Sequence, residues 1–164
     1  MEIQKVSRDS AKHIRDIAQA CAIDLTQAYG EGHWSKVRSL QTVRRNIEKK
    51  DVYLCRLNST PVATFALSAK KPVFISAKLF SKPDEPYAWL TDLYVHPDYQ
   101  RKGIGKKCMA AIRKLLRSQE RKWLRFDAYD AKAGACEFYL KCDCTLIGKA
   151  TASGTKLLVY EVRV

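Results

Sequence analysis

No stretch of this sequence is apolar over the roughly 20 residues that a membrane-spanning helix needs. The first residues also lack the apolar core of a signal peptide, because Glu2, Lys5, Arg8 and Asp9 place charges there. We therefore expect a soluble, cytoplasmic protein that does not bind a membrane.

The six cysteines lack the spacing of a metal site or of a disulfide framework. None of them forms a C-x-x-C pair. Cys142 and Cys144 are separated by one residue, which is too close for an ordinary disulfide or for a tetrahedral zinc site. We therefore expect reduced and mostly buried thiols, and no bound metal.

Internal repeats and low-complexity tracts are also missing. The chain has 164 residues, of which 46% are hydrophobic. This is enough to bury a core, and the chain is too short for two ordinary domains. We expect a single domain that spans residues 1–164.

Acidic residues are scarce relative to basic ones. Thirty Lys and Arg against 17 Asp and Glu give a formal net charge of +13. Such a charge favours an acidic partner, and nucleic acid is the general candidate. The basic residues are nevertheless spread along the chain, and no RNP, zinc-finger or basic-zipper pattern concentrates them. We expect a solvated basic surface and no specific nucleic-acid partner.

What the sequence does contain is a strand joined to a helix through a basic, glycine-bearing turn. Residues 88–95 are apolar and β-branched or aromatic, which favours a strand, and Pro97 ends its ladder because proline has no N–H. From Ile104 onward apolar residues recur with the helical period of 3.6. The free N–H groups at the start of that helix, the positive end of its dipole, and the missing Cβ atoms of Gly103 and Gly105 predict a pyrophosphate-binding turn.

Hydrophobic periodicity and turn residues predict the order of the other elements. Helices are expected after a cap at Ser7, Asp9 or Ser10, after a cap at Ser35, from Ile104, and at 133–141. The expected strands cover 2–6, 52–57, 62–69, 88–95, 123–129, 145–149 and 156–164, and the last two should form a closing hairpin around Ala152-Ser153-Gly154. Residues 70–86 contain three prolines, and we expect them to form a long excursion.

Two motifs resemble the GCN5-related N-acetyltransferase (GNAT) superfamily. Gln100-x-x-Gly103-x-Gly105, after a strand end of the type Val-x-Pro-x-Tyr, resembles its acetyl-CoA signature. At the expected distance, Ala135-x-x-Phe138-Tyr139-x-Lys141 resembles its C-terminal helix. The element order fits along nearly the whole chain. The resemblance implies an α/β fold with a mixed, mostly antiparallel sheet of about seven strands, helices on both faces, and a splay at the central strand.

The resemblance also implies acetyl-CoA as co-substrate and assigns residues to it. The main-chain groups of Leu93 and Val95, with Tyr94 between them, would pair with the pantetheine arm, since unpaired strand groups inside a fold are costly. The pyrophosphate would lie on the amides of residues 101–106. The complete cofactor-binding set is Leu93, Tyr94, Val95, Gln100, Arg101, Lys102, Gly103, Ile104, Gly105, Lys106 and Lys132. Lys132 stands where the family usually has asparagine.

Two residues are expected to take part in catalysis. Tyr139 matches the family's helix tyrosine, and its phenol could protonate the departing thiolate; the alternative is a core tyrosine beside Phe138. Asp92 lies beside the pantetheine segment and could act as the base or anchor the ammonium, the alternative being a solvated or salt-bridged carboxylate. Asp92 and Thr91 face opposite ways along a strand unless a bulge intervenes.

Three residues are expected to help to bind the acceptor. Trp34 lies in the loop between the first two helices, which helps to wall the acceptor pocket in this family. Asp127 and Tyr129 end the strand at 123–129, where an acidic and aromatic strand end could receive an amine. Ordinary packing roles are the alternative for all three.

The implied function is transfer of an acetyl group from acetyl-CoA to a primary amine of a small molecule or peptide. Two alternatives stay open: acetylation of protein lysines or N-termini, and a non-catalytic module that binds acyl-CoA or nucleic acid. A homodimer is left open as well. Fold analogy does not name the acceptor.

Overall fold

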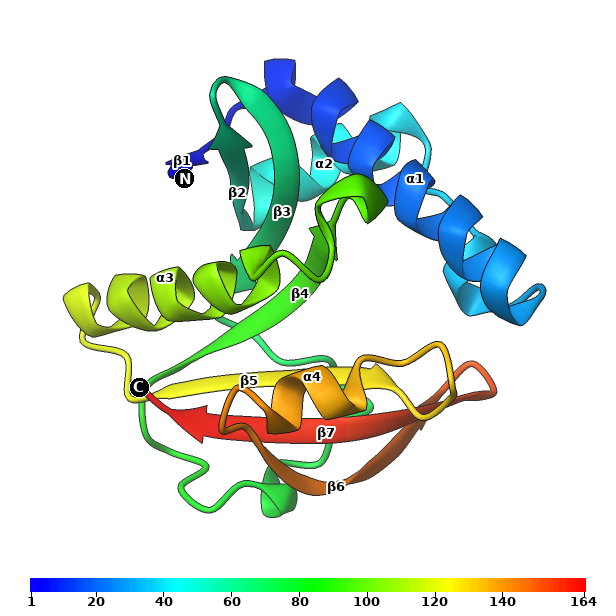
Figure 1. Cartoon of the computed structure of the whole chain (residues 1–164). Coiled ribbons are helices and arrows are strands. Elements are labelled where there is room, and N and C mark those ends of the chain that lie inside the picture. The colour runs from blue at the N-terminus through cyan, green and yellow to red at the C-terminus, as the bar shows by residue number, and fades with distance from the viewer. The chain divides into compact units, whose positions relative to one another are not determined.

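A computed structural model describes all 164 residues, and its strands form one seven-stranded sheet with the order β1-β2-β3-β4-β5-β7-β6 (Figure 1). The β4–β5 pair is parallel, whereas the β1–β2, β2–β3, β5–β7 and β6–β7 pairs are antiparallel. The predicted mixed, mostly antiparallel α/β sheet is therefore confirmed. The strands are Glu2–Lys5, Asp51–Leu57, Thr60–Ser68, Tyr87–Val95, Trp123–Tyr129, Thr145–Ala152 and Thr155–Arg163 (β1 to β7).

The helices are α1 (Ala11–Tyr29), α2 (Leu40–Lys49), α3 (Ile104–Ser118) and α4 (Cys136–Leu140). None of them is both long enough and apolar enough to cross a membrane. The contacts divide the chain into a first unit, residues 1–67 and 92–108, and a second unit, residues 68–91 and 109–164. β4 and α3 each contribute residues to both units. The single domain over residues 1–164 stays a prediction.

In the first unit, α1 and α2 cover one face of β2 and β3. Their buried apolar residues form a cluster with strand residues of that face: Ala11, Ile14, Ile17, Cys21, Val43, Val52, Leu54 and Ala66. Because side chains alternate along a strand, Cys55 points to the opposite face. There its thiol lies 3.7 Å from that of Cys108 on α3. Helices thus lie on both faces of this part of the sheet. All six cysteines are free thiols, and all except the partly exposed Cys136 are buried, in agreement with the expected mostly buried thiols.

The second helix begins later than predicted. Ser35 does not cap it, because its hydroxyl lies 2.7 Å from that of Thr26 and accepts a hydrogen bond from the Gly32 N–H. The cap is Ser39, whose hydroxyl accepts the Thr42 N–H at 3.2 Å. Both serines satisfy the local rule for a cap, and the contact with α1 decides between them.

Two-residue turns with positive φ join both hairpins, as such turns require. Asn58 and Ser59 (φ 47° and 67°) join β2 to β3, and Ser153 and Gly154 (φ 47° and 80°) join β6 to β7. The turn at 153–154 agrees with the prediction. β3 begins at Thr60, two residues earlier than predicted, and Pro61 is accommodated where the register shifts next to Arg56.

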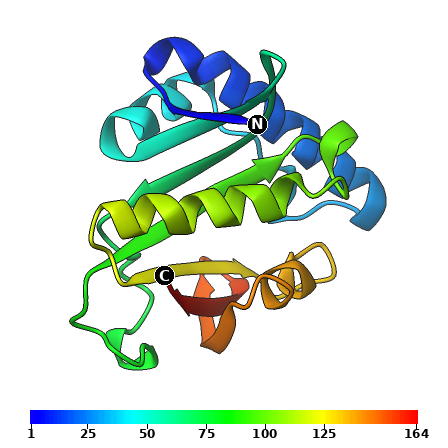
Figure 2. The same ribbon diagram turned by 60° about the vertical axis from the view of Figure 1, so that its left-hand side comes forward.

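In the second unit, β5, β7 and β6 form part of the sheet, and different segments of the chain pack on its two faces. On one face Tyr139 of α4 packs on Phe126 and Tyr160, with ring centroids 4.4 Å and 5.6 Å away. The other face is covered by the predicted excursion, residues 70–86, which is irregular apart from one 3-10 turn, Ala77–Leu79 (Figure 2). The last helix is shorter than the expected 133–141, because the Gly134 N–H closes a turn on the Ala131 carbonyl before it starts.

A buried arginine holds the excursion on the sheet. Arg125 is fully buried, and its guanidinium stacks over the rings of Phe80 and Tyr87, with distances of 4.3 Å and 4.7 Å to the ring centroids. It donates to the carbonyls of Lys82 and Pro83. It also lies 3.5 Å from the carboxylate of Glu161, whose other oxygen accepts the Ser81 N–H.

Arg125→Met should lower the free energy of unfolding by about 3 kcal/mol, because it leaves the Glu161 carboxylate buried without its cation. Urea unfolding measures the loss. Replacing both partners, Arg125→Met with Glu161→Leu, should recover at least half of it, and Arg163→Met at an exposed position of β7 is the control. Equal free energies of unfolding for Arg125→Met and the wild type would contradict this role of Arg125.

Candidate functional site

The turn before α3 has the geometry of an anion cradle. Arg101 and Gly103 have positive φ values, 56° and 79°, so the chain reverses sharply before the helix. The Lys107 N–H donates a hydrogen bond to the Gly103 carbonyl at 3.0 Å. By helix geometry, the N–H groups before it in the first turn of α3 have no intrahelical acceptor. They lie at the positive end of the dipole, where a phosphate is stabilised.

The charged side chains of this turn are exposed, and its apolar side chain is buried. Arg101, Lys102 and Lys106 are exposed, while Ile104 is buried and fixes the start of the helix. A Cβ atom built on Gly103 would meet no atom within 4 Å, so the space beside this glycine is open. The basic residues of the predicted set, Arg101, Lys102 and Lys106, are thus exposed on this turn and the start of α3.

The side chain of Gln100, in contrast, forms a hydrogen bond within the protein. Its Nε2 donates to the Val95 carbonyl at 3.0 Å, and the Cys21 thiol donates to the same carbonyl at 3.1 Å. Burial raises the pKa of Cys21 to about 11, so this thiol stays a donor at neutral pH. The His96 N–H bonds to the Val62 carbonyl of β3 at 2.9 Å, so the main-chain groups of Val95 point away from β3. The Gln100 side chain therefore fixes the end of β4.

The backbone of β4 changes conformation at Asp92. Residues Tyr87 to Leu90 pair with β5, and this register ends at Leu90. Asp92 has a left-handed φ of 57°, which is uncommon for a residue other than glycine and occurs at bulges. The regular alternation of side chains along β4 is therefore interrupted at Asp92.

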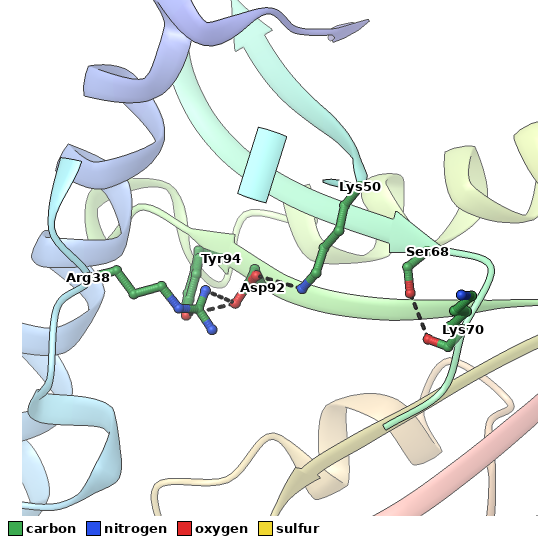
Figure 3. A network of polar contacts seen from close by, with 6 residues as sticks. All are labelled: Arg38, Lys50, Ser68, Lys70, Asp92 and Tyr94. Carbon is green, nitrogen blue, oxygen red and sulfur yellow. Dashed lines mark hydrogen bonds and ion pairs between the residues drawn. The ribbon is translucent and has the colours of Figure 1, made fainter. Parts of the chain in front are cut away.

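The Asp92 carboxylate is the centre of a charged cluster (Figure 3). Arg38 donates to Oδ1 at 2.6 Å, and Lys50 lies 3.7 Å from Oδ2. The hydroxyl of Tyr94 donates to Oδ1 at 3.4 Å, while its ring packs against the apolar cluster of α1 and α2. We call Arg38, Lys50, Asp92 and Tyr94 the Asp92 cluster. From the sequence alone, Arg38 and Lys50 are two of the basic residues that are spread along the chain. No residue near either of them indicates that it contacts Asp92.

Tyr139 lies in the second unit among aromatic rings. It is 8% exposed, and Phe138 lies edge-on with its centroid 5.1 Å away. Burial, followed by the neighbouring Cys144 and Asp127, raises the pKa of its phenol above the ordinary value. The phenol is therefore a proton donor at neutral pH, and both the catalytic and the packing interpretation are compatible with this environment.

The other predicted site residues are partly exposed or exposed. Trp34 lies in the first unit, where its indole N–H donates to the Gly30 carbonyl at 3.0 Å. Asp127 and Tyr129 lie at the end of β5 and are half-buried, and Lys132 is exposed in the turn before α4. Their assignment to the acceptor and the cofactor stays a prediction.

The profile of the acetyltransferase (GNAT) family matches residues 14–143. The chain belongs to the GNAT acetyltransferase family. The match includes both the turn before α3 and α4. No curated protein matches the sequence.

Many solved structures share this GNAT fold at low sequence identity. The PaiA N-acetyltransferase of Thermoplasma acidophilum, in complex with coenzyme A, is 17% identical with a TM-score of 0.75, over 99% of this chain and 98% of that one. The ribosomal-protein-S18-alanine N-acetyltransferase of Escherichia coli is 16% identical (TM-score 0.70, 99% and 93% covered). YncA of Salmonella typhimurium, in a structure with its cofactor acetyl-CoA, is 14% identical (0.70, 99% and 93%).

The left-handed backbone at Asp92 predicts how substitutions there affect stability. Asp92→Val should cost about 1–2 kcal/mol through backbone strain alone, because a β-branched residue fits this conformation poorly. Asp92→Asn, which tolerates the conformation, should lose at most about 1 kcal/mol with its ion pair. Urea unfolding of both variants separates strain from charge, with Asp84→Val at an exposed position as the control. Equal losses for valine and asparagine would mean that the conformation carries no cost.

Proposed function

We propose that the protein transfers an acetyl group from acetyl-CoA to the primary amine of a small molecule or peptide. The observation that carries this proposal is the turn before α3. Open space at Gly103, helix N–H groups that have no intrahelical acceptor, and the exposed side chains of Arg101, Lys102 and Lys106 suit a pyrophosphate there. The membership in the GNAT family and the neighbours solved with coenzyme A or acetyl-CoA support the same co-substrate.

The pantetheine arm would continue from this turn along β4. The Val95 carbonyl already accepts two hydrogen bonds, so we assign to the arm the Val95 N–H and the main-chain groups of Leu93. An extended arm that pairs with these groups behaves like an added strand. Gln100 would support the arm indirectly by fixing the Val95 carbonyl.

The chemistry requires a nucleophilic amine and a protonated leaving group. Bound acetyl-CoA supplies a thioester whose carbonyl carbon is attacked by the amine nitrogen, and the C–S bond breaks as the C–N bond forms. The amine loses a proton, and the thiolate sulfur gains one. We assign the second proton transfer to Tyr139, because it matches the tyrosine of the family helix and a phenol hydroxyl can donate to sulfur.

Asp92 would act mainly as an electrostatic anchor. Its carboxylate is held by ion pairs with Arg38 and Lys50, so its negative charge is fixed in place beside the proposed pantetheine segment. A screen of amines with acetyl-CoA, read by release of free thiol, tests the proposed activity directly. No thiol release with small amines, peptides or folded proteins would remove the proposal.

Gly103→Val should weaken coenzyme A binding about 10-fold or more, at least about 1.4 kcal/mol, because its side chain enters the space of the pyrophosphate. Calorimetric titration measures the affinity. Gly154→Val is a matched control: Gly154 has nearly the same φ and equally open surroundings but lies in the β6–β7 turn. Both variants bear the same backbone strain, and the control should bind coenzyme A normally. Equal affinity in both variants would contradict the assigned turn.

Tyr139→Phe should lower kcat about 10²-fold and leave coenzyme A affinity unchanged, because the hydroxyl acts on the leaving group. Tyr160→Phe is the control, since this neighbouring tyrosine is also buried. It should lose about 1 kcal/mol of stability or less and keep its kcat. Turnover, melting temperature and coenzyme A affinity are measured on each variant. Full turnover in folded Tyr139→Phe would assign the proton to water or to another group.

A further inference from the structure

We infer that α3 binds the phosphate backbone of double-stranded nucleic acid through an exposed basic face, without reading the base sequence. The face consists of Lys106, Lys107, Lys114 and Arg117, all of which are exposed, and we call it the α3 basic face. The inference goes beyond the proposed acetyl transfer, because of these four residues only Lys106 is assigned to acetyl-CoA.

The four residues of the α3 basic face share one side of the helix. α3 is one continuous helix from Ile104 to Ser118, so its period of 3.6 residues fixes the directions of its side chains (Figure 1). At roughly 100° per residue, the four cations fall within an arc of about 100°. They extend along the helix for about 16 Å, since each residue adds about 1.5 Å. The buried residues of α3 lie on the opposite side: Ile104, Cys108, Met109, Ile112 and Leu116.

The charge of this face is not neutralised within the protein. The sequence has no Asp or Glu between Asp98 and Glu120, and no ion pair of the structure includes a residue of 100–118. Exposed lysines elsewhere do pair with carboxylates, as Lys12 does with Asp16 at 2.6 Å. The face therefore presents four positive charges to a partner, and Arg101 and Lys102 add two more in the preceding turn. A row of cations without anions attracts a partner with repeated negative charges.

The composition of the face favours phosphates over an acidic protein. Protein–protein interfaces are anchored by aromatic and other large apolar side chains, whereas binding to a nucleic-acid backbone is driven mainly by charge. None of the large hydrophobic residues that are exposed belongs to α3. Ala110, which is exposed between the cations, is too small to anchor a protein partner. The face thus offers charge without an apolar anchor.

The same composition favours a duplex over a single strand. Proteins that bind single strands stack the bases on aromatic rings, and α3 contains no aromatic residue. The bases of a duplex are already stacked, and its phosphates follow one another at about 3.4 Å per strand along the axis. The face is therefore long enough to cover four or so phosphates. Contacts of Lys and Arg with phosphates position a protein but carry no sequence information.

The test measures the binding of two labelled duplexes of about 20 base pairs, one of DNA and one of RNA with the same sequence, to the 164-residue chain. At least one of them should bind with a dissociation constant of about 10⁻⁶ M or tighter at about 50 mM salt. Raising the salt to about 200 mM should weaken binding about 100-fold, as expected for about four neutralised phosphates. The double variant Lys114→Gln with Arg117→Gln should weaken binding about 10-fold and leave coenzyme A affinity unchanged.

Arg44→Gln with Lys49→Gln is the matched control, because it removes one arginine and one lysine from exposed positions of another helix, α2. It should keep the duplex affinity within about 3-fold. Melting curves show that both double variants are folded. Equal losses in the two variants would mean that only the net charge matters and would overturn the assignment to α3.

Three further results would overturn the inference. One is a dissociation constant above about 10⁻⁴ M for both duplexes at about 50 mM salt. The others are tighter binding of poly-glutamate or of a single-stranded oligonucleotide than of either duplex. Binding of either duplex through α3 supports the inference, and the comparison of the two shows whether DNA or RNA is preferred. Thiol release from acetyl-CoA does not enter this test, so its failure would leave the proposed function intact.

Discussion

The left-handed backbone at Asp92 is the constraint on which the candidate site depends. Over Tyr87 to Leu90, β4 pairs with β5 as an ordinary parallel strand. If that pairing continued, the main-chain groups of residues 93–95 would be used within the sheet, and none would remain for a ligand. The left-handed residue lies just beyond the last residue of β4 that pairs with β5, and the same residue places a carboxylate between Arg38 and Lys50. One irregular residue thus determines both what the backbone offers and how the charges beside it are arranged.

Aspartate suits this position for two reasons. It tolerates the left-handed region better than most residues, and its short side chain brings the carboxylate within reach of cations from other segments of the first unit. The ion pair with Arg38 and the hydroxyl of Tyr94 in turn hold the side chain in one orientation. Backbone conformation and charge therefore support each other, and a local strain of this kind is typical of functional sites.

The sequence predicts most of the fold, because the relevant signals are local. The turn at Gly103, the hairpin turn at Ser153 and Gly154, and the apolar faces of the helices all depend on residues a few positions apart. The cap of α2 was misplaced, since Ser35 and Ser39 are locally equivalent and only the contact of Ser35 with Thr26 distinguishes them.

Features that depend on residues far apart in the sequence could not be predicted from it. Arg38 and Asp92 are 54 positions apart, and nothing near Arg38 distinguishes it from the other basic residues of the surface. Arg125 lies in a strand where a charged residue would ordinarily face water. Its burial depends on aromatic rings and carbonyls of the excursion 70–86. The left-handed conformation of Asp92 could not be predicted either, because no residue near it in the sequence signals this conformation.

The anchoring of the excursion also determines where the chain can change length. Ile75 and Phe80 are buried and Arg125 holds the carbonyls of Lys82 and Pro83, whereas Val73 and Phe74 at the tip are exposed. Extra residues inserted at this tip would lengthen a loop whose two ends stay fixed. Doubling the length of such a loop costs only about 0.6 kcal/mol of closure entropy. The tip is thus the place where new sequence could be added to the second unit at little thermodynamic cost.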